Sequence, residues 1–504
     1  MKEVKYVTQE EINSILWKAC DTFRGILNSA TYMNYLLPML FLKYISDSWE
    51  LKYEDTEEDT LSEINFKKNR LKLERFILPN KCHFNDIYDQ RNTKEIGKII
   101  NNVFHKVEEA NKEKLTGVFR NIDFNSEALL GQSKERNLRL KNLLEDFNSP
   151  KLNLRQCLIG NQDIIGNAYE YLIYKFAAGA GQKAGEFYTP SEVSELIAQL
   201  IDLKEGETIC DPTCGSGSLL IKCANQLVKK GIYNFHLYGQ EINGQTYALA
   251  KMNMFLHNVV HAHIEWCDSI RNPKLVKNNK IMKFDVLVAN PPFSLEKWGI
   301  EQASTDIYNR FHRGLPPKSK GDYAFISHMI ESMNEKSGRI AMIVSHGVLF
   351  RGSTEKKIRR KLIEENLLDA VIGLPDNLFY GTIIPAVILI FKKNKSNSSI
   401  LFIDASFEFN SEKKKNALRQ KDIEKILIAY EKRETIKGFS YNASFSEIEE
   451  NDFNLNISHF VNNSKDTCEI DIISIQHEIN KLEKECAGAH SAMNRQLIEL
   501  GFKL

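Results

Sequence analysis

The 504-residue sequence has no long apolar run and no excess of charge of one sign. Its most apolar stretch, Tyr32 to Ile45, is interrupted by Asn34 and Lys43 and falls short of the ~18 uninterrupted apolar residues that a membrane span requires. The first residues also lack the apolar core of a signal peptide, so we expect a cytoplasmic protein with no membrane association. The 67 basic and 66 acidic residues exclude a uniformly basic coat for nucleic acid but leave room for a local basic surface.

Two further patterns are missing. The nine cysteines follow no repeating interval, and neither the cysteines at 210–223 nor the histidines at 257–263 form paired Cys-x-x-Cys ligands, so we predict free thiols and no metal site. No Gly-x4-Gly-Lys-Ser/Thr loop occurs either, which argues against a nucleotide triphosphatase that holds phosphates in this way.

The chain divides into three regions that differ in their pattern of apolar and polar residues. Residues 1–155 are mostly helical, as the apolar periodicity of Glu10 to Asn28 indicates, and Tyr32 to Ile45 is expected to form a buried helix. In residues 156–465, short β-rich runs alternate with helical ones and predict a doubly wound α/β sheet, with polar helix after residue 406. The predicted strands are Thr208–Cys210, Phe235–Gly239, Asp285–Ala289, Arg339–Val344, Asp369–Gly373, Ala386–Phe391 and Ile400–Ile403.

Residues 466–504 predict one C-terminal helix. Apolar residues recur there in alternating steps of three and four: Ile472, Ile475, Ile479, Leu482, Cys486, Ala489 and Met493. Such a narrow apolar seam is typical of a helix that packs along a partner helix. The alternative is an amphipathic helix folded back on its own domain.

The strongest chemical signal is a glycine-rich turn that directly follows the first predicted strand. It reads Asp211, Pro212, Thr213, Cys214, Gly215, Ser216, Gly217 and Ser218. Glycines at 215 and 217 allow a tight turn with room for a ligand beside the main chain, although a purely structural turn would use them too. Glu241 ends the next strand and Asp268 follows the third, so a carboxylate stands at each strand end. Together these acids predict a nucleoside pocket at the carboxyl edge of the sheet.

The fourth strand is followed by Asn290, Pro291, Pro292 and Phe293. The prolines stiffen the turn and restrict Asn290 to extended conformations. The Asn290 side-chain carbonyl and the Pro291 backbone carbonyl then form two neighbouring acceptors for a planar amino group. Accepting from both hydrogens makes the amino nitrogen a better nucleophile, while Phe293 offers a face on which a flipped base can stack. A structural Pro-Pro turn is the simpler alternative.

These motifs resemble those of amino-group DNA methyltransferases in the γ order, with the cofactor motif before the catalytic one. More specifically, most of the chain resembles the modification subunit of type I restriction–modification systems. The further segments that carry this resemblance are 21–25, 41–47, 166–170, 185–190, 314–325, 347–352, 374–382 and 453–457.

The resemblance implies a Rossmann-like S-adenosylmethionine-dependent methyltransferase sheet with an α-helical N-terminal domain and a C-terminal helical tail. It implies methyl transfer from S-adenosylmethionine to the N6 amino group of adenine, with Asn290, Pro291, Pro292 and Phe293 at the base and Glu241 at the ribose. Asp268 would lie near the cofactor adenine and Asp211 to Ser218 would cradle the cofactor. The residues that would close over its methionine part are Glu186, Phe187, Tyr188, Thr189, Pro190 and Ser191.

The resemblance also implies partners. They are double-stranded DNA in a specific sequence, a specificity subunit, a restriction/translocase subunit and a second modification subunit in the same complex. Because no spare β-rich segment remains for target recognition and the net charge is only +1, we expect the chain to bind duplex DNA poorly by itself.

Several alternatives stay open at the level of sequence. The same tetrapeptide type serves enzymes that methylate protein glutamine, RNA bases or cytosine N4, and a catalytically silent scaffold is a further alternative, although the intact Asp211, Glu241 and Asn290 argue against it. One basic cluster could contact DNA phosphates or form a solvated helix face. It comprises Arg351, Lys356, Lys357, Arg359, Arg360 and Lys361.

Overall fold

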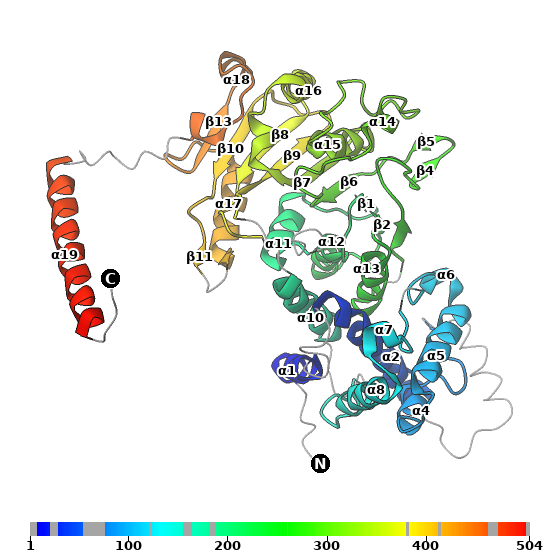
Figure 1. Cartoon of the computed structure of the whole chain (residues 1–504). Coiled ribbons are helices and arrows are strands. Elements are labelled where there is room, and N and C mark those ends of the chain that lie inside the picture. Colours follow the sequence, from blue (N-terminus) through cyan, green and yellow to red (C-terminus); the bar gives the residue numbers. More distant parts are fainter. Residues whose placement is uncertain are drawn as a thin grey trace, which may run out of the picture.

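The computed structural model describes residues 8–20, 29–53, 76–120, 122–154, 164–180, 188–259, 261–379, 383–411, 415–461 and 472–499. An α-helical region drawn in blue and cyan lies below an α/β region drawn in green to orange (Figure 1). The last helix, α19 (Ile472–Glu499), lies to one side of both regions (Figure 1). In the described ranges, no helix has the length and apolar character needed to cross a lipid bilayer.

The helical region begins with α1, where Thr8 and Glu11 form a reciprocal capping box. The helix expected from Glu10 to Asn28 ends at Ala19, and residues 21–28 lie outside the described ranges. The expected buried helix over Tyr32 to Ile45 is confirmed within α2. The helices of this region are α1 (Gln9–Ala19), α2 (Ser29–Tyr53), α4 (Phe84–Asp89), α5 (Ile96–Ala110), α6 (Lys112–Leu115), α7 (Glu127–Leu130), α8 (Ser133–Phe147) and α10 (Ile164–Ala180).

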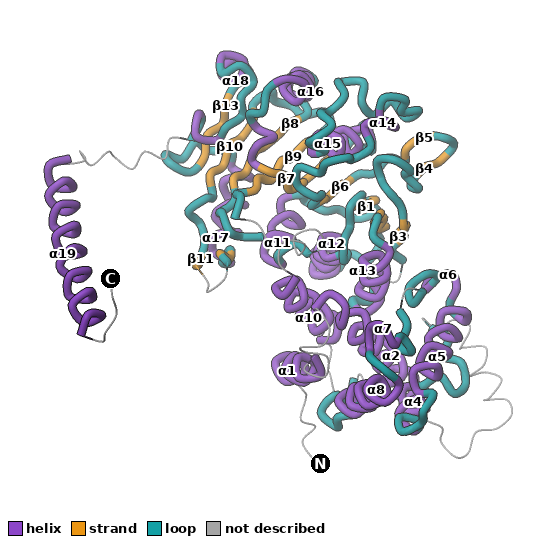
Figure 2. Tube along the Cα trace, in the orientation of Figure 1, coloured by secondary structure: helices purple, strands orange, loops and turns teal. Residues whose placement is uncertain are grey.

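The α/β region contains a nine-stranded sheet in the described part of the chain (Figure 2). Its strand order is β13-β10-β8-β9-β7-β6-β1-β2-β3. The seven predicted strands all form, and the third-strand end expected at Cys267 falls at Trp266. The strands are β1 (Thr208–Asp211), β2 (His236–Glu241), β3 (His263–Trp266), β6 (Val286–Ala289), β7 (Arg339–Ser345), β8 (Leu368–Gly373), β9 (Ala386–Lys392), β10 (Ile400–Asp404) and β13 (Ser440–Ala443).

The half of the sheet that carries the candidate site is parallel. β3, β2, β1, β6 and β7 pair in parallel, whereas β9 runs antiparallel to both β7 and β8. The carboxyl ends of β1, β2, β3 and β6 therefore meet at one edge. Because β1 stands between β6 and β2, the chain reverses its winding direction there, and this is where ligands bind in open α/β sheets.

Helices cover both faces of the sheet, which explains why the central strands β6, β7 and β9 are apolar along most of their length. Along β7, Ala341 and Ile343 join the core beneath α11, α12 and α17, whereas Ile340, Met342 and Val344 join the core beneath α15, α16 and α18. These helices are α11 (Ser191–Leu200), α12 (Ser218–Lys229), α15 (Asp322–Glu331), α16 (Ser353–Glu364), α17 (Gln420–Lys432) and α18 (Phe445–Glu450).

Helix α13 (Gly244–Leu256) joins the two regions. The Phe255 ring contacts the rings of Phe41 and Phe76 in the helical region, with centroids 6.0 and 4.6 Å apart. α13 begins three residues after β2, so the helical region packs on an element that starts beside the candidate site. The remaining short elements are β4 (Val276–Lys277), β5 (Lys280–Ile281), α14 (Ile300–Ala303), η3 (His346–Leu349), β11 (Asn410–Ser411), β12 (Asn416–Ala417) and η4 (Ile457–His459).

Residues after 406 depart from the expected polar helix. Besides α17 and α18 they contribute β13, which pairs antiparallel with β10 and forms the edge of the sheet. The sequence Ser-Tyr-Asn-Ala of β13 has no apolar alternation, so its strand is determined by the exposed edge of β10 rather than by local pattern.

Candidate active site

A cavity of about 360 Å³ opens at the carboxyl edge of the sheet. Residues from the ends of three strands line it, among them Glu241 at the end of β2, Asp268 after β3 and Asn290 after β6. A narrower hollow shares Thr213 and Asn290 with this cavity and is lined also by Tyr188, Thr189 and Asp211. The two hollows together run from the glycine turn past Asn290 to the end of β3, and the larger one has the volume of a small-molecule site.

The glycine turn between β1 and α12 is held in one conformation. Gly215 and Gly217 have φ angles of 55° and 83°, in the left-handed region that favours glycine. A Cβ on Gly217 would lie 2.7 Å from Cε of Met254, so the turn packs tightly on α13. The Asn253 amide, also on α13, donates to the carbonyl of Ser216 at 3.0 Å. The turn can therefore offer its main chain to a ligand without rearranging.

Asp211 is buried at the end of β1, with 1% of its surface exposed. Its carboxylate accepts from the Thr213 backbone N–H at 2.9 Å. Burial raises the pKa of Asp211 to about 8, although the Thr213 hydrogen bond opposes this shift and nearby Glu241 adds to it. A buried carboxyl in this state is suited to a cationic ligand group, whose charge would favour ionisation.

Glu241 connects the ends of two strands. One carboxylate oxygen accepts from the Gly215 N–H at 3.0 Å and the other accepts from the Asn243 N–H at 2.7 Å. Burial raises the pKa of Glu241, while these two backbone donors oppose the shift. Each oxygen keeps a further acceptor position, so this carboxylate can still accept from the hydroxyls of a ribose.

The far wall of the cavity is the turn after β3. The Asp268 side chain accepts from the backbone N–H groups of Ile270 and Arg271, both at 2.9 Å. Arg310, with 3% of its surface exposed, donates to the carbonyls of Ser269 at 3.0 Å and Ile270 at 2.7 Å. A buried guanidinium therefore fixes this wall from a segment forty residues away in sequence. Sequence reasoning missed Arg310, because no local pattern marks it.

The turn after β6 presents the proline-bracketed motif. Pro291 is buried and Asn290 is half-buried. The Asn290 side-chain N–H donates to the hydroxyl of Thr189 at 3.0 Å. The Phe293 ring meets that of Phe379 edge to face, with centroids 6.0 Å apart and planes at 73°. The motif thus stands beside the glycine turn, with an aromatic pair next to it.

Most of the predicted site residues line one of the two hollows, and some others lie elsewhere. Tyr188, Thr189, Asp211, Thr213, Gly215, Ser216, Ser218 and Asn290 line the narrower hollow. Thr213, Glu241, Asp268, Asn290 and Pro292 line the larger cavity. Pro190 is the N-cap of α11 and Ser191 its first residue, so these two act at the start of that helix. Glu186 and Phe187 lie outside the described residues.

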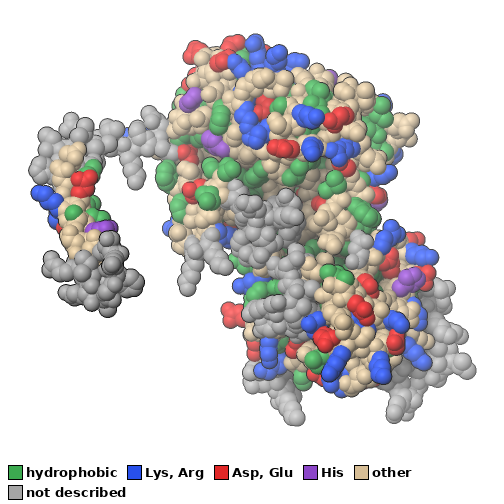
Figure 3. Space-filling model, in the orientation of Figure 1, with side chains coloured by type: hydrophobic (Ala, Val, Ile, Leu, Met, Phe, Trp, Pro, Cys, Tyr) green, Lys and Arg blue, Asp and Glu red, His purple; other side chains and the backbone are tan. Residues whose placement is uncertain are grey.

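The basic cluster at 351–361 does not form one phosphate-binding face. Arg359 is buried and donates to the carbonyls of Val348, Arg351 and Phe453, and Arg351 donates to carboxylates. Arg359 is thus an internal residue, and the half-buried Arg351 is bound to carboxylates, so neither is a free cation on an exposed face. Over the face seen in Figure 3, basic and acidic side chains are interspersed, as the balanced composition requires.

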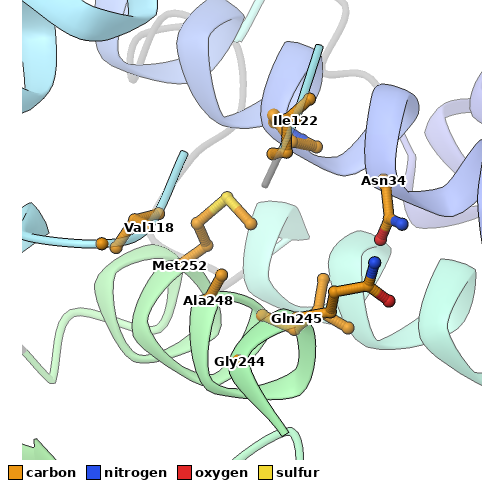
Figure 4. A pocket seen from close by; sticks show the side chains of 10 residues that line it. Asn34, Val118, Ile122, Gly244, Gln245, Ala248 and Met252 are labelled. Carbon is orange, nitrogen blue, oxygen red and sulfur yellow. The ribbon is translucent and has the colours of Figure 1, made fainter. Parts of the chain in front are cut away.

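A separate hollow lies between the helical region and α13 (Figure 4). Asn34 of α2 and Gln245 of α13 point toward each other across it, and Val118 and Met252 also line it (Figure 4). Its volume is about 10 Å³, which is room for a single water and too little for a nucleoside.

Comparison with known proteins identifies the family of this chain. The model of the N-6 DNA methylase family matches residues 160–468, and that of the HsdM N-terminal domain matches residues 12–147. The type I restriction enzyme MpnII methylase subunit of Mycoplasma pneumoniae is 31% identical over 96% of this chain and 95% of its own length. The MjaVIII methylase subunit of Methanocaldococcus jannaschii is 33% identical over 96% of this chain and 83% of its own length.

A solved structure is similar over nearly the same span. The methyltransferase subunit of a type I restriction–modification system from Streptococcus thermophilus has a TM-score of 0.80 and 34% identity, and the match covers 90% of this chain and all of that one. The likeness confirms the predicted α/β methyltransferase sheet with its helical N-terminal region, and the family confirms S-adenosylmethionine as methyl donor. The chain therefore belongs to the N-6 DNA methylase family and, within it, to the methylase subunits of type I restriction enzymes.

Proposed function

We propose that this chain methylates the N6 amino group of adenine in a specific double-stranded DNA sequence, protecting host DNA from restriction, and that the turn after β6 binds the target base. The observation that carries this proposal is the shared position of Asn290, which lines both the hollow beside the glycine turn and the cavity that Glu241 and Asp268 line.

The residues that line the two neighbouring hollows have donors and acceptors that fit S-adenosylmethionine. We assign the turn Asp211 to Ser218 and the segment Tyr188 to Ser191 to its methionine part, with Glu186 and Phe187 as the continuation of that segment. Glu241 would accept from the ribose hydroxyls and Asp268 would lie beside the adenine. When bound, the cofactor supplies an electrophilic methyl group.

The base-binding residues act by accepting hydrogen bonds. The Asn290 side-chain oxygen and the Pro291 carbonyl oxygen accept from the two hydrogens of the adenine amino group, which keeps the nitrogen lone pair out of the ring and available for attack. Since the Asn290 N–H is engaged by Thr189, its oxygen is the end of the amide turned to this task. Phe293, which follows Pro292 and packs on Phe379, stacks on the base. Fixed dipoles and orientation provide the rate enhancement, with no side-chain nucleophile.

We also propose that the chain has three parts with different roles. Residues 1–155 form a helical N-terminal domain, residues 156–465 the catalytic domain, and residues 466–504 a helix for subunit docking. In α19 the side chains of Ile479, Leu482 and Met493 are 43%, 57% and 48% exposed, which supports a partner helix over packing on its own domain. The balanced charge supports dependence on a specificity subunit for DNA binding.

The remaining parts of the proposal concern the assembly. We propose a complex with the specificity subunit, two modification subunits and a restriction/translocase subunit, located in the cytoplasm.

The experiment is product analysis. The chain, assembled with its specificity subunit, is incubated with duplex DNA and labelled S-adenosylmethionine, and the DNA is digested to nucleosides. Label in N6-methyladenine at a defined sequence supports the proposal. Label in N4-methylcytosine would contradict it, as would label on RNA or on protein glutamine, but not on DNA, in parallel reactions that contain those substrates. No label in any of these reactions would indicate a catalytically silent scaffold.

A further inference from the structure

The residue after the catalytic tetrapeptide has an unusual backbone. Ser294 has a φ of 52°, in the left-handed region that costs a non-glycine residue about 1 kcal/mol. Its backbone N–H donates to Oδ1 of Asp322 at 3.1 Å, and its hydroxyl accepts from Nη2 of Arg351 at 3.1 Å. Both bonds hold the residue that follows Phe293, so they act on the last residue of the base-binding motif.

Asp322 and Arg351 are themselves fixed. Arg351 Nη1 donates to Oδ2 of Asp322 at 2.9 Å and to Glu355 at 3.3 Å, while Nη2 donates also to the hydroxyl of Ser345 at 3.0 Å. Asp322 and Glu355 each have 2% of their surface exposed. The cluster therefore joins the turn after β6 to the end of β7 and to the first turns of α15 and α16.

A buried ionic cluster of this kind is a weak source of stability. Removing charges from water costs several kcal/mol per ion, and well-packed apolar residues of similar volume are often equally stable or more so. What the charged cluster provides, and an apolar one would not, is directional hydrogen bonds to a specific backbone N–H and hydroxyl. Both of these groups belong to Ser294.

We propose that Asp322 and Arg351 are positioning residues for methyl transfer, which hold Ser294 in its left-handed conformation and so set the orientation of Phe293 and Asn290. This inference rests on the proposed function. It places neither residue in contact with the adenine or the cofactor. Losing the cluster should therefore slow the chemical step and leave cofactor binding unchanged.

The test compares variants that remove one charge each, in the full chain assembled with its specificity subunit. Asp322→Asn and Arg351→Met remove one charge each, and Ser294→Gly is added to Asp322→Asn because glycine adopts a positive φ without steric cost. Glu207→Gln is the matched control, since Glu207 binds the half-buried Arg339 at 2.7 Å. This pair lies at the amino ends of β1 and β7, away from the candidate site. The measurements are the single-turnover rate of adenine methylation, the Kd for S-adenosylmethionine and the Tm.

We expect Asp322→Asn and Arg351→Met to lower the single-turnover rate by about 10- to 100-fold, as misplacement of reacting groups does, with the cofactor Kd changed less than about twofold. Glu207→Gln should keep its rate, and Ser294→Gly should restore part of the rate lost in Asp322→Asn. Rates that equal the Glu207→Gln rate, a parallel loss of cofactor affinity, or no recovery by glycine would overturn the inference. A wild-type complex that methylates no adenine would instead contradict the proposed function and this inference with it.

Discussion

The side-chain amide of Asn290 donates to the hydroxyl of Thr189 at 3.0 Å, across 101 positions of sequence. Thr189 precedes α11 and belongs to the segment expected over the methionine part of the cofactor, whereas Asn290 belongs to the turn that we propose to bind the base. One hydrogen bond thus connects these two segments, and the Asn290 side-chain oxygen is left to accept from another group.

Thr189→Val should remove this bond while keeping the shape of the side chain. We expect the rate of methyl transfer to fall by about 5-fold, because one hydrogen bond of ~1 kcal/mol no longer orients the amide. Thr189→Ser keeps a hydroxyl and should retain most of the rate. Single-turnover assays of both variants decide the matter, and equal rates for valine and serine would show that the bond has no catalytic role.

The affinity for S-adenosylmethionine should depend on pH through Asp211. Burial raises the pKa of Asp211 to about 8, so in the free protein this carboxyl is protonated below that pH. A cationic ligand favours the ionised form of Asp211, so the Kd for S-adenosylmethionine should fall as the pH rises from 6 to 8. The Kd should change by at most about tenfold per pH unit and should level off above pH 8. Calorimetry in buffers of different ionisation enthalpy should detect proton release on binding below pH 8. Asp211→Asn should bind more weakly with a flat profile; a wild-type Kd that does not vary with pH would contradict this role.

Gly217→Ala should damage the cofactor turn in two separable ways. The left-handed φ of 83° costs alanine about 1–2 kcal/mol of unfolding free energy, and the new Cβ would meet Met254 at 2.7 Å. Gly231→Ala is the control, since Gly231 has a φ of 76° with nothing within 4 Å of its Cβ. Chemical denaturation should show a similar backbone cost in both variants, and only Gly217→Ala should also lose cofactor affinity. Normal cofactor binding by Gly217→Ala would argue against the assigned cradle.

Deleting residues 466–504 should impair assembly with the specificity subunit. The deletion removes the exposed apolar seam of α19 and leaves the sheet and its cavity untouched. The shortened chain should keep its Tm and its affinity for S-adenosylmethionine. Co-purification measures the loss, and a shortened chain that still forms the full complex would show that docking occurs elsewhere.

The strands and the strand-end residues could be predicted from the sequence because their signals are local. Continuous apolar runs mark β6, β7 and β9, and the residues at the carboxyl ends of parallel strands must meet at one edge. The sequence alone therefore predicts that Asp211, Glu241, Asp268 and Asn290 lie close together. The sequence did not predict β13, because its four residues carry no strand pattern of their own.

The interactions that hold the site could not be predicted in this way, because they join segments far apart in sequence. Nothing near Arg310 indicates that it binds the carbonyls of Ser269 and Ile270. The run of charge at 351–361 has the pattern of a solvent-exposed helix face, yet Arg351 and Arg359 point inward, since their partners come from α15 and from the segment after α18. Charge in a sequence indicates a partner but does not say which one.

The most direct test of the account separates cofactor binding from chemistry at Asn290. Asn290→Ala in the assembled complex should bind S-adenosylmethionine with an unchanged Kd, while the single-turnover rate of adenine methylation falls by at least about 100-fold, the loss typical of removing one preorganised dipole from a reaction centre. A variant that methylates adenine at the wild-type rate would contradict the central claim.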